Sequence, residues 1–182
     1  MTIELQITID TADWQTALPE ADALVRRAAQ AALAKAAPVL PAGSEVGVLL
    51  TSDAVSRRLN HGYRGRDAAT NVLAFATGDE SVSDDAQPVL LGDIVVALGV
   101  LLQEADAQDK RAADHLAHLV VHGVLHLLGH DHEDESAAAA MEALEIGVLA
   151  DLGIANPYAA PGASAAPGPE RPRSVPQEVV KA

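Results

Sequence analysis

Apolar and polar residues alternate at the start of the chain, where isoleucine or leucine occupies every second position of residues 3–9. This period of two is typical of a β-strand with one buried face. Short apolar runs predict three further strands, at residues 46–51, 71–76 and 93–98.

Other segments repeat their apolar residues at helical spacing. In residues 19–37, Leu24, Ala28 and Ala32 recur every fourth position, and Pro38 ends the segment. The other predicted helices lie at 53–59 (capped by Ser52), 98–107, 111–128 and 134–152. Strands interspersed with helices predict an α+β fold, a single layered domain in which a small mixed β-sheet packs with about five helices.

The periodic pattern ends near residue 158. Residues 159–182 hold five of the ten prolines and almost no periodic apolar residues, a composition that buries too little surface to fold. We therefore expect one domain over residues 1–158, followed by a disordered tail over residues 159–182.

The acidic segment 78–88 is expected to form a loop. We expect neither a signal peptide nor a membrane helix, and a cytoplasmic location fits this.

Composition narrows the chemistry. The chain has no cysteine, which excludes disulfides, zinc fingers and a thiol nucleophile, so any metal must be bound by His, Asp or Glu. The formal net charge is -14, whereas nucleic-acid-binding proteins usually show a basic surface. Taken alone, this charge favours small molecules, cations or basic proteins as ligands.

Histidines concentrate in one segment, and three of them have the spacing of a metal site. His122 and His126 are four residues apart, so on a helix they share a face and can bind one ion. Gly129 accepts a positive φ, which lets the helix end and the chain fold back to bring His132 to the same ion. Three imidazoles with one open position are what a catalytic zinc site requires, so these are the predicted ligands of one Zn²⁺ ion.

The neighbouring residues have less specific interpretations. His115, His118 and His130 are expected to be structural residues with hydrogen-bond partners, although His118 is the best competing ligand because it lies one turn before His122. Asp131 either orients a ligand histidine or forms a turn.

The spacing H-x3-H-x2-G-x2-H is that of the metzincin proteases, which carry a general-base glutamate directly after the first histidine. Gly123 occupies that position here, which argues against peptide hydrolysis.

Basic residues gather in a second segment. Residues 1–158 contain nine basic and 24 acidic side chains, and four of the nine lie in residues 57–66, where Gly62 and Gly65 suggest an irregular, exposed backbone. The planar fork of arginine matches phosphate oxygens, whereas a solvated helix end with salt bridges to nearby aspartates is the alternative.

Together these motifs resemble the YbeY family of bacterial rRNA maturation endoribonucleases. The matching segments are LNHGYRGRD at 59–67, TNVL at 70–73, LGDIV at 91–95, HGVLHLLGHDH at 122–132, MEALE at 141–145 and NPY at 156–158. The chain departs from the family pattern at His130, where many relatives have Tyr, and at Ala74 and Ala76, where Ser and Pro are usual.

The resemblance implies a cytoplasmic, zinc-dependent, single-strand-specific endoribonuclease that acts in maturation of the 3′ end of 16S rRNA and in ribosome quality control. It implies zinc ligands at His122, His126 and His132 and a phosphate contact at Arg64. The implied partners are single-stranded rRNA, the small ribosomal subunit with its proteins and a ribosome-assembly GTPase, with no membrane. Two alternatives stay open: a metal hydrolase of another substrate, including a peptidase with Asp131 or Glu133 as base, and a zinc-stabilised assembly factor without catalysis.

Overall fold

The computed structural model describes residues 3–37, 40–77, 87–132 and 134–159. Four strands form one mixed sheet in the order β1-β2-β4-β3. Strands β1, β2 and β4 run parallel, and the edge strand β3 is antiparallel to β4. The strands are β1 (Glu4–Ile9), β2 (Glu45–Thr51), β3 (Val72–Ala76) and β4 (Leu90–Ala97).

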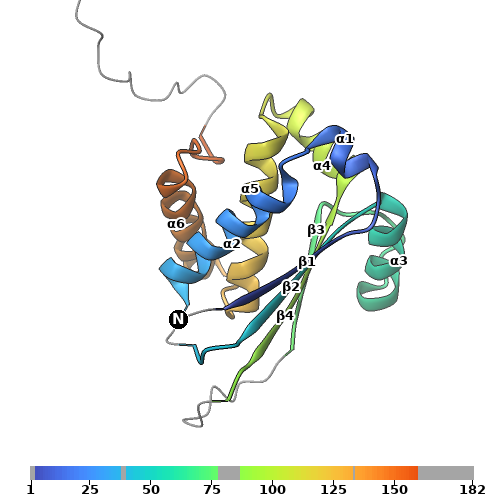
Figure 1. Ribbon diagram of the computed structural model, residues 1–182. Coiled ribbons are helices and arrows are strands. Elements are labelled where there is room, and N and C mark those ends of the chain that lie inside the picture. The colour runs from blue at the N-terminus through green and yellow to red at the C-terminus, as the bar shows by residue number, and fades with distance from the viewer. Residues whose placement is uncertain (1–2, 38–39, 78–86, 133, 160–182) are drawn as a thin grey trace, which may run out of the picture.

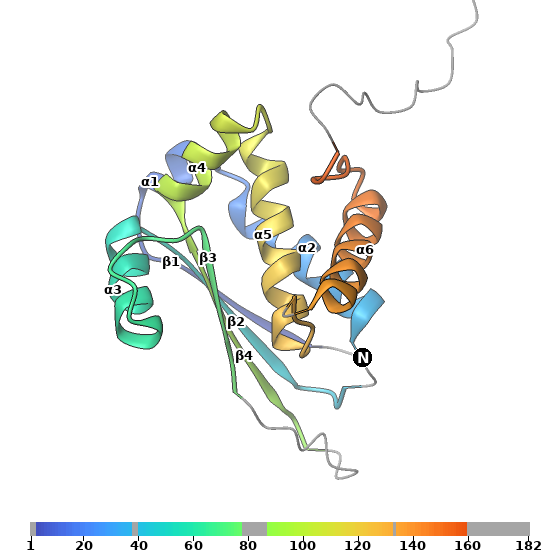
Figure 2. The same cartoon turned by 180° about the vertical axis from the view of Figure 1, so that it is seen from behind.

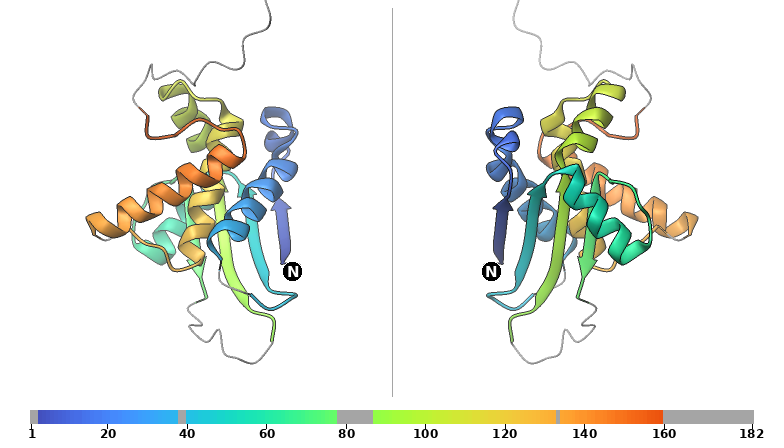
Figure 3. Two further views of the ribbon diagram at one scale, coloured as in Figure 1. Left: turned by 90° about the vertical axis from the view of Figure 1, so that its left-hand side faces the viewer. Right: turned by 90° about the vertical axis from the view of Figure 1, so that its right-hand side faces the viewer.

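Six helices occur in the described ranges, and they cover both faces of the sheet (Figures 1 and 3). Helix α3 lies on one face, α2 and α5 lie on the other, and α6 packs outside against α2 and α5. The helices are α1 (Asp13–Ala17), α2 (Ala21–Ala36), α3 (Asp53–Arg64), α4 (Leu98–Ala107), α5 (Ala112–Leu127) and α6 (Glu135–Asp151). The α+β prediction, with its small mixed sheet, is therefore confirmed.

Helix α5 is the centre of the core. It is apolar on nearly every side, and Leu116, Val120 and Val124 are fully buried, because the sheet covers one side and α2 and α6 cover the other. Close packing on the sheet depends on Gly123, where a Cβ atom would lie 2.9 Å from a methyl group of Ile94 in β4. No side chain larger than hydrogen fits there without displacing Ile94.

The predicted elements are present, with several corrections; β4, for example, begins at Leu90 instead of residue 93. The short helix α1 was missed because it has only five residues, too few for a periodic pattern; it is anchored by the buried Trp14, whose Nε1 donates to the carbonyl of Thr51 at 3.0 Å. Helix α3 runs to Arg64 instead of ending at residue 59, so Gly62 is helical and the expectation of irregular backbone there was wrong. Gly65, at φ +68°, ends the helix, because glycine adopts this conformation without strain.

Helix α3 also differs at its start. Ser52 occupies the position before the helix but makes no side-chain capping hydrogen bond. Instead the Asp53 carboxylate accepts hydrogen bonds from the backbone of Gly99 and Val100, in the first turn of α4.

Most of the predicted loop 78–88 and all but the first residue of the predicted tail lie outside the described residues, so the domain boundary near residue 158 stays a prediction. In the described ranges no helix is long and apolar enough to cross a membrane.

Candidate metal centre

The three histidines predicted as metal ligands lie together. His122, His126 and His132 each offer one ring nitrogen, and these nitrogens are all within 4.8 Å of one another. The Nε2 atoms of His122 and His126 are 3.0 Å apart, and the ring centroid of His132 lies 5.1 Å from that of His126. Among the described residues this is the only group of three such side chains close enough to bind one ion.

The end of α5 accounts for this convergence. His122 and His126 are one helical turn apart, and Gly129 then adopts φ +85°. Two backbone hydrogen bonds close the turn, from Gly129 to the carbonyl of His126 and from His130 to the carbonyl of Leu125, both at 3.0 Å. The chain therefore folds back as the sequence predicts and brings His132 to the exposed side of the cluster.

A buried carboxylate orients His122. Glu145 of α6, only 1% exposed, lies with Oε1 2.6 Å from Nδ1 of His122. Because an ionised carboxylate only accepts hydrogen bonds, Nδ1 carries the proton and the lone pair of Nε2 faces the cluster. This is the tautomer that a metal ion requires.

The donor chemistry of the triad fits a divalent cation such as zinc. Burial, followed by the neighbouring His122 and His132 rings, lowers the pKa of His126 and favours its neutral, metal-binding form. Three imidazoles without a fourth protein ligand match a catalytic site better than a structural one. The roles of these residues as ligands remain predictions, since the structure establishes only their convergence.

Glu145 was not predicted from the sequence. It also accepts hydrogen bonds from Nε2 of His118, at 2.9 Å, and from the hydroxyl of Tyr158. Burial alone would raise the pKa of Glu145, but the hydrogen bonds from the two histidines and Tyr158 outweigh it and lower the pKa to about 2. The available signal was a lone acidic side chain on the buried face of α6, one turn after the buried Met141.

The remaining histidines lie outside the triad. His118 is held by Glu145, and Nε2 of His115 lies 2.8 Å from Glu104, so both have the structural partners that were expected. His130 is also outside the group of converging nitrogens. Asp131 accepts a hydrogen bond from the backbone of His132 at 2.6 Å, and its carboxylate lies 3.9 Å from that ring, so it both shapes the turn and faces a predicted ligand.

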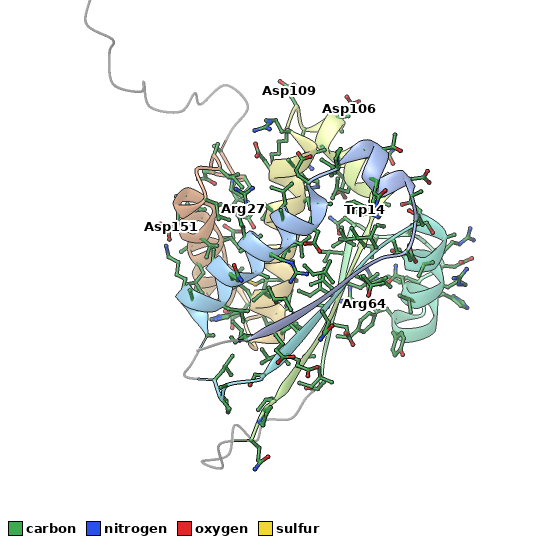
Figure 4. The ribbon with its side chains drawn as sticks, viewed as in Figure 1. Trp14, Arg27, Arg64, Asp106, Asp109 and Asp151 are labelled. Carbon is green, nitrogen blue, oxygen red and sulfur yellow. The ribbon has the colours of Figure 1, made fainter. Side chains whose placement is uncertain are left out.

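The triad opens into a cavity of about 380 Å³ that lies at the edge strand β3. Figure 2 shows β3 between α3 on one side and α5 on the other. Arg64 lines this cavity from the end of α3, beside the strands (Figure 4), although α3 covers the opposite face of the sheet from α5. The lining residues are Arg64, Thr70, Asn71, Val72, Ala74, His122, Gly123, His126, Asp131 and His132.

Only one arginine of the basic segment reaches the cavity. Arg57 instead forms two hydrogen bonds with Asp67, at 2.6 and 2.8 Å, and these raise the pKa of Arg57 and lower that of Asp67. The salt-bridge interpretation is therefore correct for Arg57. Arg64 takes part in no ion pair with any described residue, which leaves its guanidinium available to an anion in the cavity.

Hydrogen bonds hold the part of the cavity wall that lies just before β3. The Asn71 side chain donates to Glu104 at 2.9 Å and accepts from the backbone of Val72 at 2.6 Å, and Glu104 is in turn held by His115. The hydroxyl of Ser56 donates to the carbonyl of Thr70. These contacts, which were not predicted, position Thr70 and Asn71, which line the cavity together with Arg64.

The buried Glu145 carboxylate is expected to make stability depend on acid pH. Its pKa lies below the ordinary value of 4.5, so its ionisation stabilises the fold above pH 4.5, and this contribution is lost as the pH falls towards 2. Glu145→Gln should lower the free energy of unfolding at pH 7 by about 3 kcal/mol, and the difference from the native chain should shrink between pH 4.5 and 2. Urea unfolding of metal-free protein at several pH values measures both. A difference that does not change with pH would contradict this account, and Glu142→Gln, an exposed neighbour on α6, is the matched control.

Comparison with known proteins places this chain in a family. A family model described as "Endoribonuclease YbeY" matches residues 6–153. The chain is 45% identical to an Endoribonuclease YbeY of Azorhizobium caulinodans, with 87% of this chain and 98% of that protein covered. It is 47% identical to an Endoribonuclease YbeY of Paramagnetospirillum magneticum, covering 87% and 97%. A protein of Thermotoga maritima solved in solution is 22% identical, with a TM-score of 0.48 over 88% of this chain and all of that chain. The family match includes most of the sheet, the histidine triad and Arg64, and the chain belongs to the YbeY family.

Proposed function

We propose that this protein is a metal-dependent endoribonuclease that hydrolyses phosphodiester bonds of single-stranded RNA. The observation that carries the proposal is one cavity lined by both the histidine triad and Arg64. An imidazole triad suits a Lewis-acidic cation, and an arginine that forms no ion pair with a described residue suits a phosphate. The relatives named Endoribonuclease YbeY support the same substrate class.

Each residue of the candidate site has its own role in the proposed hydrolysis. When bound by the triad, a Zn²⁺ ion supplies Lewis acidity at its open position. Arg64 holds the scissile phosphate through its guanidinium and balances the negative charge that develops there. Asn71, fixed by Glu104, presents its remaining amide hydrogen to the substrate, and Glu145 keeps Nε2 of His122 deprotonated.

The acidic net charge is compatible with this substrate. Arg64 is the one arginine of α3 that lines the cavity, while the rest of the chain is strongly acidic. Repulsion from that remainder lowers affinity for RNA elsewhere on the surface, so we expect weak nonspecific binding.

The finer proposal follows the family resemblance. The substrate is rRNA, at the 3′ end of 16S rRNA, and the cleavage serves rRNA maturation and ribosome quality control. The partners are the small ribosomal subunit with its proteins and a ribosome-assembly GTPase, and the location is the cytoplasm.

Peptide hydrolysis is disfavoured by packing. The position of the metzincin base is Gly123, and a side chain there would collide with Ile94. Among the described residues that line the cavity, Asp131 is the only carboxylate.

A zinc-stabilised assembly factor without catalysis remains a second candidate. It predicts that the protein associates with the ribosome, that Arg64→Ala weakens this association, and that no cleavage products form.

Metal removal tests the proposal directly. Treatment of the purified protein with EDTA is expected to stop cleavage of single-stranded rRNA, and about one equivalent of Zn²⁺ per chain should restore it. Product formation on denaturing gels, with metal content measured on the same samples, provides the readout. Cleavage that survives complete metal removal would exclude the mechanism, and casein turnover in a preparation inert on RNA would favour the peptidase.

A further inference from the structure

Tyr63 is an aromatic side chain with no role in the core. The chain has only four Phe, Trp and Tyr residues. Trp14 is fully buried, and the Tyr158 hydroxyl donates a hydrogen bond to Glu145. The other two, Tyr63 and Phe75, pack on each other with ring centroids 4.8 Å apart and planes tilted by 54°, yet Tyr63 remains 73% exposed.

This aromatic pair adjoins the candidate active site. Tyr63 directly precedes Arg64 at the end of α3, and Phe75 directly follows Ala74 on β3, and both Arg64 and Ala74 line the cavity. Successive residues of a strand point to opposite faces, so Phe75, which packs on Tyr63 of α3, lies on the other side of β3 from Ala74, which lines the cavity with His122 and His126 of α5. An RNA strand that crosses the edge of the sheet at β3 therefore meets the cavity first and Tyr63 next.

The charge around Tyr63 favours a polyanion. Arg58 and Arg66, like Arg64, are exposed and form no ion pair with any described residue. The nearest acidic residue in the sequence, Asp67, is already engaged by Arg57. Exposed aromatic rings interleaved with arginines are how proteins bind single-stranded nucleic acid, because bases stack on the rings while cations follow the backbone.

We propose that Tyr63, supported from beneath by Phe75, is a stacking platform for one unpaired RNA base next to the phosphate that Arg64 holds. This inference rests on the proposed function and adds a binding site to it. A base can reach the ring only when it is free of a duplex, so the platform selects single-stranded RNA by stacking and not by reading sequence. The tyrosine hydroxyl forms no hydrogen bond with a described residue, and the platform does not require it.

Two substitutions at Tyr63 separate stacking from simple coverage of Phe75. Tyr63→Leu still covers Phe75 but lacks a π-face, so the KM for a single-stranded RNA oligonucleotide should rise about tenfold, with a smaller change in kcat. Tyr63→Phe keeps the ring and should behave as the native protein. Equal KM values for the leucine variant and the native protein would overturn the proposal, and this is the result expected if the ring docks a protein partner instead.

An abasic scan of the substrate tests the platform without altering the protein. A series of oligonucleotides with one defined cleavage site, each lacking one base, should show raised KM at one or two positions beside the scissile phosphate. Tyr63→Leu should be insensitive at those same positions. RNA that is cleaved with a flat abasic profile would overturn the platform alone, whereas RNA that is neither bound nor cleaved by the native protein would overturn the proposed function with it.

Discussion

Replacement of His126 by alanine is expected to remove bound metal and RNA cleavage together. His126 faces both other predicted ligands, with its Nε2 3.0 Å from that of His122 and its ring 5.1 Å from that of His132. Loss of an outer hydrogen-bond partner alone costs about 10–100-fold in metal affinity, so loss of a ligand should lower affinity and cleavage at least about 100-fold. Metal analysis of the purified variant and initial rates on single-stranded rRNA measure the two effects.

His130→Ala is the matched control for this experiment. His130 lies four residues further along, half-buried, and outside the group of converging nitrogens. The hydrogen bond that it donates to Leu125 comes from its backbone, so alanine preserves the turn at Gly129. The control should retain metal and activity, and a His126→Ala protein that folds, lacks metal and still cleaves RNA would refute the assigned site.

Local patterns in the sequence predicted most of the secondary structure and the core of the site. The spacing of His122 and His126 and the turn at Gly129 are local, because helix geometry and the freedom of glycine act over a few residues. Their convergence with His132 could therefore be anticipated from a segment of eleven residues.

Contacts between distant segments could not be anticipated in the same way. The hydrogen bond from His122 to Glu145 depends on how α6 packs against α5, and the one from Asn71 to Glu104 depends on how the segment just before β3 meets α4. Each partner is an ordinary polar residue in its own segment. The aromatic pair of Tyr63 and Phe75 likewise exists only because α3 lies against the edge strand.

The same limit applied to the arginine segment. Charge alone could not show which of the four arginines lines the cavity, since Arg57, Arg58, Arg64 and Arg66 are all exposed and close in sequence. The unpredicted extension of α3 separates them, because it pairs Arg57 with Asp67 and carries Arg64 to the cavity. Of the four arginines, only Arg64 lines the cavity together with the histidine triad.

Arg64→Ala is therefore expected to lower kcat for RNA cleavage by about 10²–10³-fold while leaving the metal content unchanged, since groups that stabilise developing charge contribute effects of this size. Arg64→Lys should restore only part of the rate, because an ammonium group keeps the charge but cannot form the paired hydrogen bonds of a guanidinium. Arg58→Ala is the control: it removes an exposed arginine of the same helix that does not line the cavity, and it should change mainly the salt dependence of binding. If Arg64→Ala and Arg58→Ala reduce kcat equally, the segment acts through general attraction for RNA and not through contact with the scissile phosphate.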